Sequence, residues 1–305
     1  MAEEKIVEKF LNNIPLSEFY NDLFKPGMKK AGEALATVID GANLILLPLK
    51  LVNSKSRVYF DNNLKKYSDK INACSDQTLS QVPQYVGLPI LDKLIYLDEN
   101  ELSDAFINLL TKASFEETLK FVHPAYLAIL ERLSADEAKI LFYYKNQENI
   151  PFFDLYVHKY IEKIKKPDHY DNEKVKTADQ IKEMIEYTTQ DKQSLYIKLY
   201  ENLSGIENNV ELFFPENIQI YIENLALNGL IKFERKLHNK NYLERYEELV
   251  NKDYKIIYEE AKENIRSINE EKGEEMELEL DIRKGFIEFT DLGKGFLNAC
   301  IREID

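Results

Sequence analysis

The stretch Pro215–Phe233, PENIQIYIENLALNGLIKF, contains the helix-to-strand change on which our fold prediction rests. Its apolar residues recur at spacings of three and four and predict an amphipathic helix over residues 215–227. Asn228 and Gly229 are residues that commonly end a helix in the left-handed conformation, and residues 230–233 then have the composition of a strand. The C-terminal part of the chain is therefore predicted to mix helix and strand.

The residues that follow extend this pattern to the C-terminus. A highly charged helix is predicted over about 242–268 and, having few uninterrupted apolar positions, is expected to be exposed or to face a partner. Residues 276–282 alternate apolar and acidic side chains, 283–285 are predicted to turn, and 286–289 to return as a second strand. Thr290 is expected to cap the last helix. The order helix, strand, hairpin, helix predicts a winged-helix-like module with the charged helix as an insertion.

Most of the first 200 residues have the apolar spacing of helices, which predicts an N-terminal helical bundle. Pro124 after His123 suits the first turn of a helix that continues through Leu133, because proline has no N–H to satisfy there. A Ser or Thr followed three residues later by Glu or Gln predicts a reciprocal cap at a helix start. Three such pairs occur, namely Ser114 with Glu117, Ser134 with Glu137, and Thr177 with Gln180.

Residues 165–176, KKPDHYDNEKVK, are nearly devoid of apolar side chains and are predicted to be a linker between two domains. We assign residues 1–170 to a helical domain and 177–305 to the winged-helix-like domain, with its charged helical insertion over about 242–268. The predicted fold class is mainly α, an N-terminal helical bundle followed by an α+β domain with a small β-sheet.

The charge of the chain argues against a nucleic-acid partner. The 305 residues carry a formal net charge of -14, and residues 205–305 contain 14 basic and 23 acidic side chains. The predicted recognition helix over 216–227 has no Lys or Arg, whereas contacts to phosphate require positive charge. Nucleic acid is therefore not an expected partner. A protein partner or self-association is favoured, and the oligomeric state is left open.

The apolar stretch 35–52 stands out as a candidate contact surface. Asp40 and Pro48 interrupt it, so a simple membrane-spanning helix is not expected. Residues 23–70 contain nine Lys or Arg against four Asp or Glu, a basic region in an acidic protein. Two interpretations stay open: the stretch is a buried core helix, or it contacts a membrane or a partner. The residues that would make this contact are Leu44, Ile45, Leu46, Leu47, Leu49 and Lys50.

No pattern of reactive side chains indicates catalysis. The four histidines lie in unrelated contexts, and the usual phosphate-binding, dinucleotide-binding, metalloprotease and hydrolase motifs do not occur. Cys74 and Cys300 are too far apart in sequence to suggest a disulfide framework or a zinc site. We therefore expect no catalytic, cofactor-binding or metal-binding residues. The acidic start of the chain does not match a secretory signal, which predicts the cytoplasm, with peripheral contact to the inner membrane left open.

Several segments taken together resemble the abortive infection alpha family, Abi-alpha. The resemblance is carried by residues 102–110 (LSDAFINLL), by His123 with Pro124, and by residues 133–141 (LSADEAKIL). Further matches are Tyr20 and Pro26 near the start, Ser134 and Glu137 in the middle, and Gly229, Thr290 and Gly293 near the end. The resemblance touches most of the chain, least so the linker and the charged helix.

The resemblance implies a bacterial anti-phage defence protein and supplies no catalytic residues to transfer. Its signature positions are expected to form turns, caps and helix starts. We predict a protein that acts without catalysis, as sensor or effector, through protein interaction and with membrane contact left open. The alternatives are a soluble interaction or regulatory protein with no membrane role, a weakly DNA-binding winged-helix regulator, and an undetected enzyme such as a nuclease.

Overall fold

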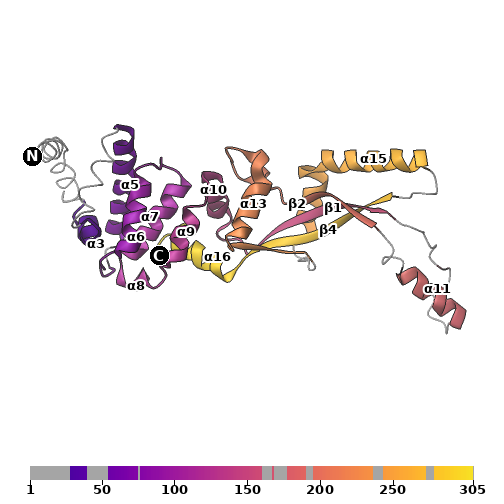
Figure 1. Cartoon of the computed structure of the whole chain (residues 1–305), viewed down its shortest axis with the longest axis horizontal. Coiled ribbons are helices and arrows are strands. Elements are labelled where there is room, and N and C mark those ends of the chain that lie inside the picture. Colours follow the sequence, from indigo (N-terminus) through magenta and orange to yellow (C-terminus); the bar gives the residue numbers. More distant parts are fainter. Residues whose placement is uncertain are drawn as a thin grey trace, which may run out of the picture. The chain divides into compact units, whose positions relative to one another are not determined.

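The computed structural model describes residues 28–39, 54–74, 76–159, 167, 177–189, 195–235, 243–272 and 278–304. These residues are mostly helical and contain one small four-stranded sheet (Figure 1). The chain divides into two compact units. Unit 1 consists of residues 1–147, 210–232 and 289–305, and unit 2 of residues 148–209 and 233–288. This division differs from the predicted boundary at 165–176, because the chain passes between the units four times.

Unit 1 is built around helix α7 (Glu101–Ala113), which contacts the surrounding helices α5, α6, α9, α10 and the final turn η6 (Figure 1). Asn100 caps its start by accepting a hydrogen bond from the backbone N–H of Ser103 at 3.0 Å. Eleven of its thirteen residues are buried, including several polar ones, so the other elements of the unit enclose this helix. The other elements of this unit are α3 (Lys29–Ile39), α5 (Ser54–Ala73), α6 (Gln84–Leu94), α8 (Glu116–Leu119), α9 (Pro124–Leu130), α10 (Ala135–Tyr144), η2 (Pro215–Asn217), α13 (Ile218–Leu227), α16 (Asp291–Phe296) and η6 (Leu297–Ile301).

Two polar side chains of α7 hold the end of the last helix. Asn108 donates from Nδ2 to the carbonyl oxygen of Cys300 at 3.0 Å, and Lys112 donates from Nζ to that of Arg302 at 2.8 Å. The last carbonyls of a helix have no partner within it, so these donors satisfy groups that would otherwise be buried without hydrogen bonds. Both side chains are nearly fully buried.

Unit 2 is built on an antiparallel sheet. Strand β1 (Asn149–Lys159) pairs on one side with β2 (Leu195–Leu203) and on the other with β4 (Leu278–Phe289), and the sheet order is β2-β1-β4-β3. The short strand β3 (Ile231–Glu234) begins in unit 1 and ends in unit 2. Along the chain, helix α11 (Ala178–Thr189) precedes β2, and helix α12 (Ile206–Asn209) follows β2.

One face of this sheet is covered by α14 (Leu243–Glu248), the π-helical turn η4 (Leu249–Asp253) and α15 (Lys255–Lys272). Their apolar side chains pack on Phe153 and Leu155 of β1 to form the core of the unit. Tyr246 is buried in this core and donates its hydroxyl hydrogen to the carbonyl oxygen of Gly285 at 2.7 Å. Burial of a tyrosine requires such a partner for its hydroxyl group.

The first 200 residues were expected to be mostly helical, and the sequence did not predict the two strands β1 and β2 that begin within them. Eight of the eleven β1 residues are buried, and they lie on both faces of the strand, so the segment does not alternate between apolar and polar side chains. Apolar periodicity cannot separate such a strand from a buried helix.

The predicted hairpin with its turn at 283–285 is also wrong, because β4 runs unbroken through these residues. Arg283, Lys284 and Gly285 pair with Asp154, Phe153 and Phe152 of β1. Gly285 is small for packing reasons, since a Cβ atom there would lie 2.6 Å from the Phe152 ring and from the carbonyl oxygen of Glu234. A winged helix is therefore not confirmed.

The predicted helix boundaries have mixed outcomes. The caps at Ser134–Glu137 and Thr177–Gln180 are confirmed, as is the start of α9 at His123 and Pro124. The Ser114–Glu117 cap is wrong, because Ser114 ends α7 and donates to the carbonyl oxygen of Leu110, while Glu117 accepts from the backbone of Thr78. Gly229 has a positive φ of 72°, and Thr290 caps α16, both as predicted.

Candidate functional site

The structure draws attention to a loop in unit 1 that ends in two exposed phenylalanines. The side chain of Phe213 is 63% exposed and that of Phe214 is 57% exposed. Exposing two adjacent large apolar side chains to water costs free energy in a protein without a binding partner. Exposed apolar groups of this kind commonly mark interaction sites. We call residues 210–214 the phenylalanine loop.

A buried carboxylate fixes this loop. Asp136, in the first turn of α10 and only 2% exposed, accepts hydrogen bonds from the backbone N–H groups of Phe213 at 2.8 Å and Phe214 at 3.0 Å. It also accepts a hydrogen bond from the hydroxyl of Tyr221 in α13 at 2.9 Å. Burial, with this bond to Asp136, raises the pKa of Tyr221. Because a charged acceptor strengthens each bond, one side chain holds the loop and α13 together.

The neighbouring carboxylate makes a second link between the same two elements. Glu137 completes the cap with Ser134, and its other oxygen accepts a hydrogen bond from Nδ2 of Asn224 in α13 at 2.6 Å. The sequence predicted the cap alone. The first turn of α10 thus has two roles, starting its own helix and anchoring residues 213–224.

The local charge around the loop is negative. Exposed carboxylates lie at Glu211, Glu216 and Glu223, and residues 210–227 contain no Lys or Arg. A cation, Lys139 of α10, lies beside the loop; its Nζ is 3.6 Å from the centre of the Phe213 ring and donates to the carbonyl oxygen of Glu211 at 2.8 Å. The ammonium group therefore steadies one phenylalanine ring and the backbone before it.

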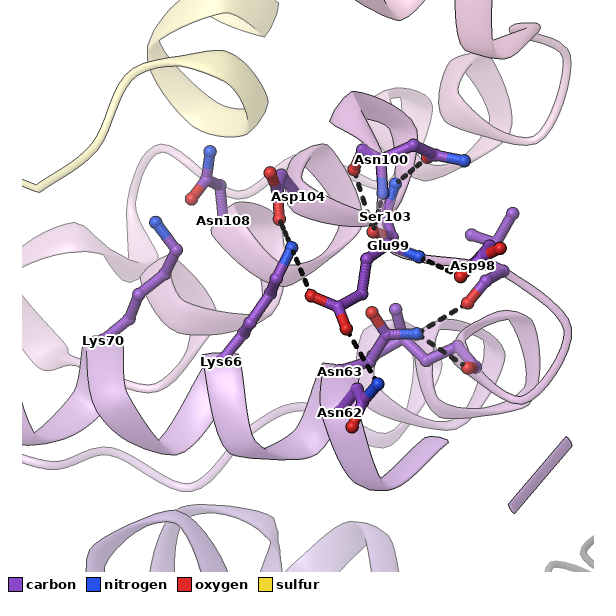
Figure 2. A network of polar contacts seen from close by, with 12 residues as sticks. Asn62, Asn63, Lys66, Lys70, Asp98, Glu99, Asn100, Ser103, Asp104 and Asn108 are labelled. Atoms are coloured by element: carbon purple, nitrogen blue, oxygen red, sulfur yellow. Dashed lines mark hydrogen bonds and ion pairs between the residues drawn. The ribbon is translucent and has the colours of Figure 1, made fainter. Parts of the chain in front are cut away.

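A second polar cluster in unit 1 connects α5 with α7 (Figure 2). Lys66 lies 2.9 Å from Asp104 and 3.5 Å from Glu99, and Asn62 donates to Glu99 at 2.7 Å. One turn along α5, Lys70 pairs with Glu303 at 2.7 Å beside a cavity of about 300 Å³. Because Lys66 and Lys70 both have carboxylate partners here, we interpret this cluster as holding helices together.

The residues predicted as a contact surface are not placed by the structure. Leu44, Ile45, Leu46, Leu47, Leu49 and Lys50 all lie outside the described residues. Tyr20 and Pro26 also lie outside them, as do two of the four histidines. His123 caps α9, and His158 is buried in β1 and stacks on Tyr196 with ring centres 4.3 Å apart.

The signature glycine near the end of the chain has a packing role. A Cβ atom on Gly293 would lie 1.9 Å from the carbonyl oxygen of Leu230, so α16 can approach this backbone only with glycine at that position. Thr290, three residues earlier, accepts a hydrogen bond from the Gly293 N–H at 2.9 Å. These positions are architectural in unit 1, as the resemblance implied.

A comparison with known protein families shows the family to which these signature positions point. Residues 59–300 match the model of a family described as abortive infection alpha. The chain belongs to the abortive infection alpha family. The match spans the cap at Ser134, the phenylalanine loop and Gly293, and it confirms the resemblance seen in the sequence. None of the curated proteins and none of the solved structures compared with this member of the abortive infection alpha family matches it.

Among the residues that the structure describes, no helix is both long enough and apolar enough to cross a membrane. The His, Cys, Asp and Glu side chains of the same residues form no group of three or more that could hold a metal ion.

Sequence reasoning did not single out Asp136, Phe213 or Phe214. A signal was present in residues 211–217, ELFFPEN, where two adjacent phenylalanines directly precede a helix-starting proline in an otherwise acidic stretch. The link to Asp136 could not be read from the sequence, because the two partners are 77 residues apart.

Proposed function

We propose that this member of the abortive infection alpha family serves in anti-phage defence without catalysis, by binding a protein through Phe213 and Phe214. The family gives the defence role, and the phenylalanine loop gives the means. The observation that carries the proposal is the fixation of both exposed phenylalanines by the buried Asp136 carboxylate.

Fixing the loop before binding favours association. A binding site that is already ordered loses less conformational freedom on association, and buried aromatic side chains provide much of the binding free energy at protein interfaces. The Asp136 bonds therefore support a recognition role for the two phenylalanine rings.

The charge of the region favours a protein partner over a membrane. The exposed carboxylates of Glu211, Glu216 and Glu223 would be repelled by an anionic lipid surface. They suit a partner whose apolar cleft has basic residues at its rim.

Exposed phenylalanines could also enter a lipid surface, and flotation with anionic vesicles distinguishes this alternative. Loss of flotation in a Phe213→Ser/Phe214→Ser variant would favour the membrane.

The proposal is tested by phage challenge of cells that produce the protein. On cells that produce the double variant Phe213→Ser/Phe214→Ser, the phage titre is expected to be close to the titre on cells without the protein. Leu227→Ser is the matched control, because Leu227 is apolar, 86% exposed and also in unit 1. Full protection by the double variant, with normal protein levels, would contradict the proposal.

A photo-crosslinking residue tests for direct contact. Placed at position 213, it is expected to give one discrete adduct in infected cells, and placed at position 227 it is expected to give none. If both positions give the same adducts, the phenylalanine loop is not the binding surface.

A further inference from the structure

Unit 2 contains an apolar groove of about 320 Å³ between α15 and the sheet. Ile197, Leu199 and Tyr200 of β2 line one side, and Ile265 and Ile268 of α15 line the other. These three β2 residues are 40–48% exposed, and most of the other residues that line the groove are apolar as well. The groove is therefore an incompletely covered part of the core face of the unit.

The groove exists because the helical layer covers the centre of the sheet better than its edge. Phe153 and Leu155 of β1 are 1% and 0% exposed beneath α14, η4 and α15. Among the described residues, β2 is an edge strand, and its apolar side chains extend past this cover. Another apolar element is needed to remove them from water.

Helix α11 has the side chains to do so. Ile181, Met184 and Ile185 follow one another at spacings of three and one and so share a face of the helix. Ile181 is 47% exposed and Ile185 is 56% exposed. The Thr177–Gln180 cap marks a well-defined helix start, yet a helix of 12 residues is marginal in water without packing of its apolar face.

The chain connections are short enough to allow α11 to reach the groove. Five residues, 190–194, separate Thr189 at the end of α11 from Leu195 at the start of β2. Fully extended, they span about 20 Å. Leu195 and Leu278 both pair with Lys159 of β1, so β2 starts at the end of the sheet where Leu278 lines the groove. The other connection, residues 160–177, is longer and sets no tighter limit.

We infer that α11 packs its Ile181, Met184 and Ile185 face into the groove between β2 and α15 of the same chain. This inference goes beyond the proposed function and does not depend on it. The short connection keeps α11 at a high local concentration near the groove, which favours the same chain over a second copy as the source of the helix. Docking would bury the exposed apolar groups of both surfaces together.

Tryptophan fluorescence tests the inference, because the chain has no tryptophan of its own. Ile185→Trp in the full chain is expected to emit further to the blue and to resist acrylamide quenching. Lys182→Trp, on the polar face of α11, is the matched control and should behave as a water-exposed indole. Equal emission and equal quenching of the two variants would overturn the inference.

A second substitution tests the groove itself. Leu199→Asp added to Ile185→Trp is expected to return the emission to that of the control. Ile256→Asp, on α15 outside the groove and 74% exposed, is expected to leave it unchanged. A blue shift that survives Leu199→Asp would show that α11 docks elsewhere, and one that disappears on dilution would show that a second copy supplies the helix. Circular dichroism checks that each variant is folded.

A cysteine pair provides an independent measurement in a Cys74→Ser background. Ile181→Cys with Ile268→Cys is expected to form a disulfide under mild oxidation and to change mobility on a non-reducing gel. Lys182→Cys with Ile268→Cys is the control and should stay reduced. Equal oxidation of both pairs would contradict a specific docked position.

Discussion

The carboxylate of Asp136 accepts a hydrogen bond from the backbone N–H of Phe213 at 2.8 Å, across 77 residues of sequence. The acceptor is almost completely buried, whereas the side chain of its donor residue is 63% exposed. A charged group inside unit 1 therefore determines where an apolar group is presented on its surface, and this relationship leads to the first prediction.

Asp136→Ala is expected to destabilise the protein and to release the phenylalanine loop. It leaves the N–H groups of Phe213 and Phe214 and the hydroxyl of Tyr221 without this acceptor. We expect a loss of about 3 kcal/mol in the free energy of unfolding, measured in urea. Amide exchange at residues 213 and 214 should become much faster. Glu216→Gln, at an exposed carboxylate of the same region, is the control; comparable losses in both variants would refute the role given to Asp136.

Gly293→Ala is expected to be one of the most damaging single-methyl substitutions in unit 1. Its Cβ would lie 1.9 Å from the carbonyl oxygen of Leu230, which is backbone and has little freedom to move. At Gly295 the nearest atom is the Tyr126 hydroxyl at 2.3 Å, at the end of a side chain that can rotate. We expect a loss of about 3 kcal/mol for Gly293→Ala and clearly less for Gly295→Ala, measured by thermal unfolding. The reverse order would contradict the packing described for α16.

Arg235→Met is expected to destabilise unit 2 through Asp154. That carboxylate is 2% exposed, forms an ion pair with Arg235, and accepts a hydrogen bond from the N–H of Asn202 at 2.8 Å. Removing the guanidinium leaves a buried negative charge without its counter-ion. We expect a loss of about 2 kcal/mol, below the value for a fully buried pair because the Arg235 side chain is 37% exposed.

The control for Arg235 is Arg266→Met, at an exposed pair with Glu270 on α15. Surface pairs of this kind contribute little, so the free energy of unfolding in urea should hardly change. If the two variants lose equal stability, the buried pair in unit 2 has no special importance.

The Lys70–Glu303 pair predicts an acid-sensitive contact at the end of the chain. The hydrogen bond and charge of Lys70 lower the pKa of Glu303 below its ordinary value of 4.5. A lowered carboxylate pKa stabilises the folded state above 4.5, and this stabilisation is lost as the pH falls through the lower folded-state value. Carbon NMR titration of the Glu303 carboxyl should therefore give an apparent pKa below 4.5.

In Lys70→Met the Glu303 titration is expected to move back up towards 4.5. Lys65→Met is a suitable comparison on the same helix, because Lys65 does not line the cavity beside Glu303. An unchanged Glu303 titration in Lys70→Met would rule out the ion pair in solution.

The sequence alone determined several features whose partners lie within a few residues of each other, although the Ser114–Glu117 cap, with the same spacing, is absent. The caps at Ser134–Glu137 and Thr177–Gln180 and the stop at Gly229 were all predicted, and all are present. Their interactions depend on local backbone geometry, which a short stretch of sequence specifies. Family membership could be predicted for a related reason, since its signature positions are mostly such local features.

Only the tertiary structure decided the features that join distant segments. Strand β1 is buried on both faces and pairs with a strand more than 100 residues later, so its sequence has no alternating pattern to reveal it. Gly285 was predicted to turn the chain, but it pairs with Phe152 within β4, and glycine is needed there because the Phe152 ring leaves no room for a side chain. The link between Asp136 and the phenylalanine loop likewise depends on how α10 packs against α13. Packing selects among locally allowed conformations, and that selection depends on partners remote in sequence.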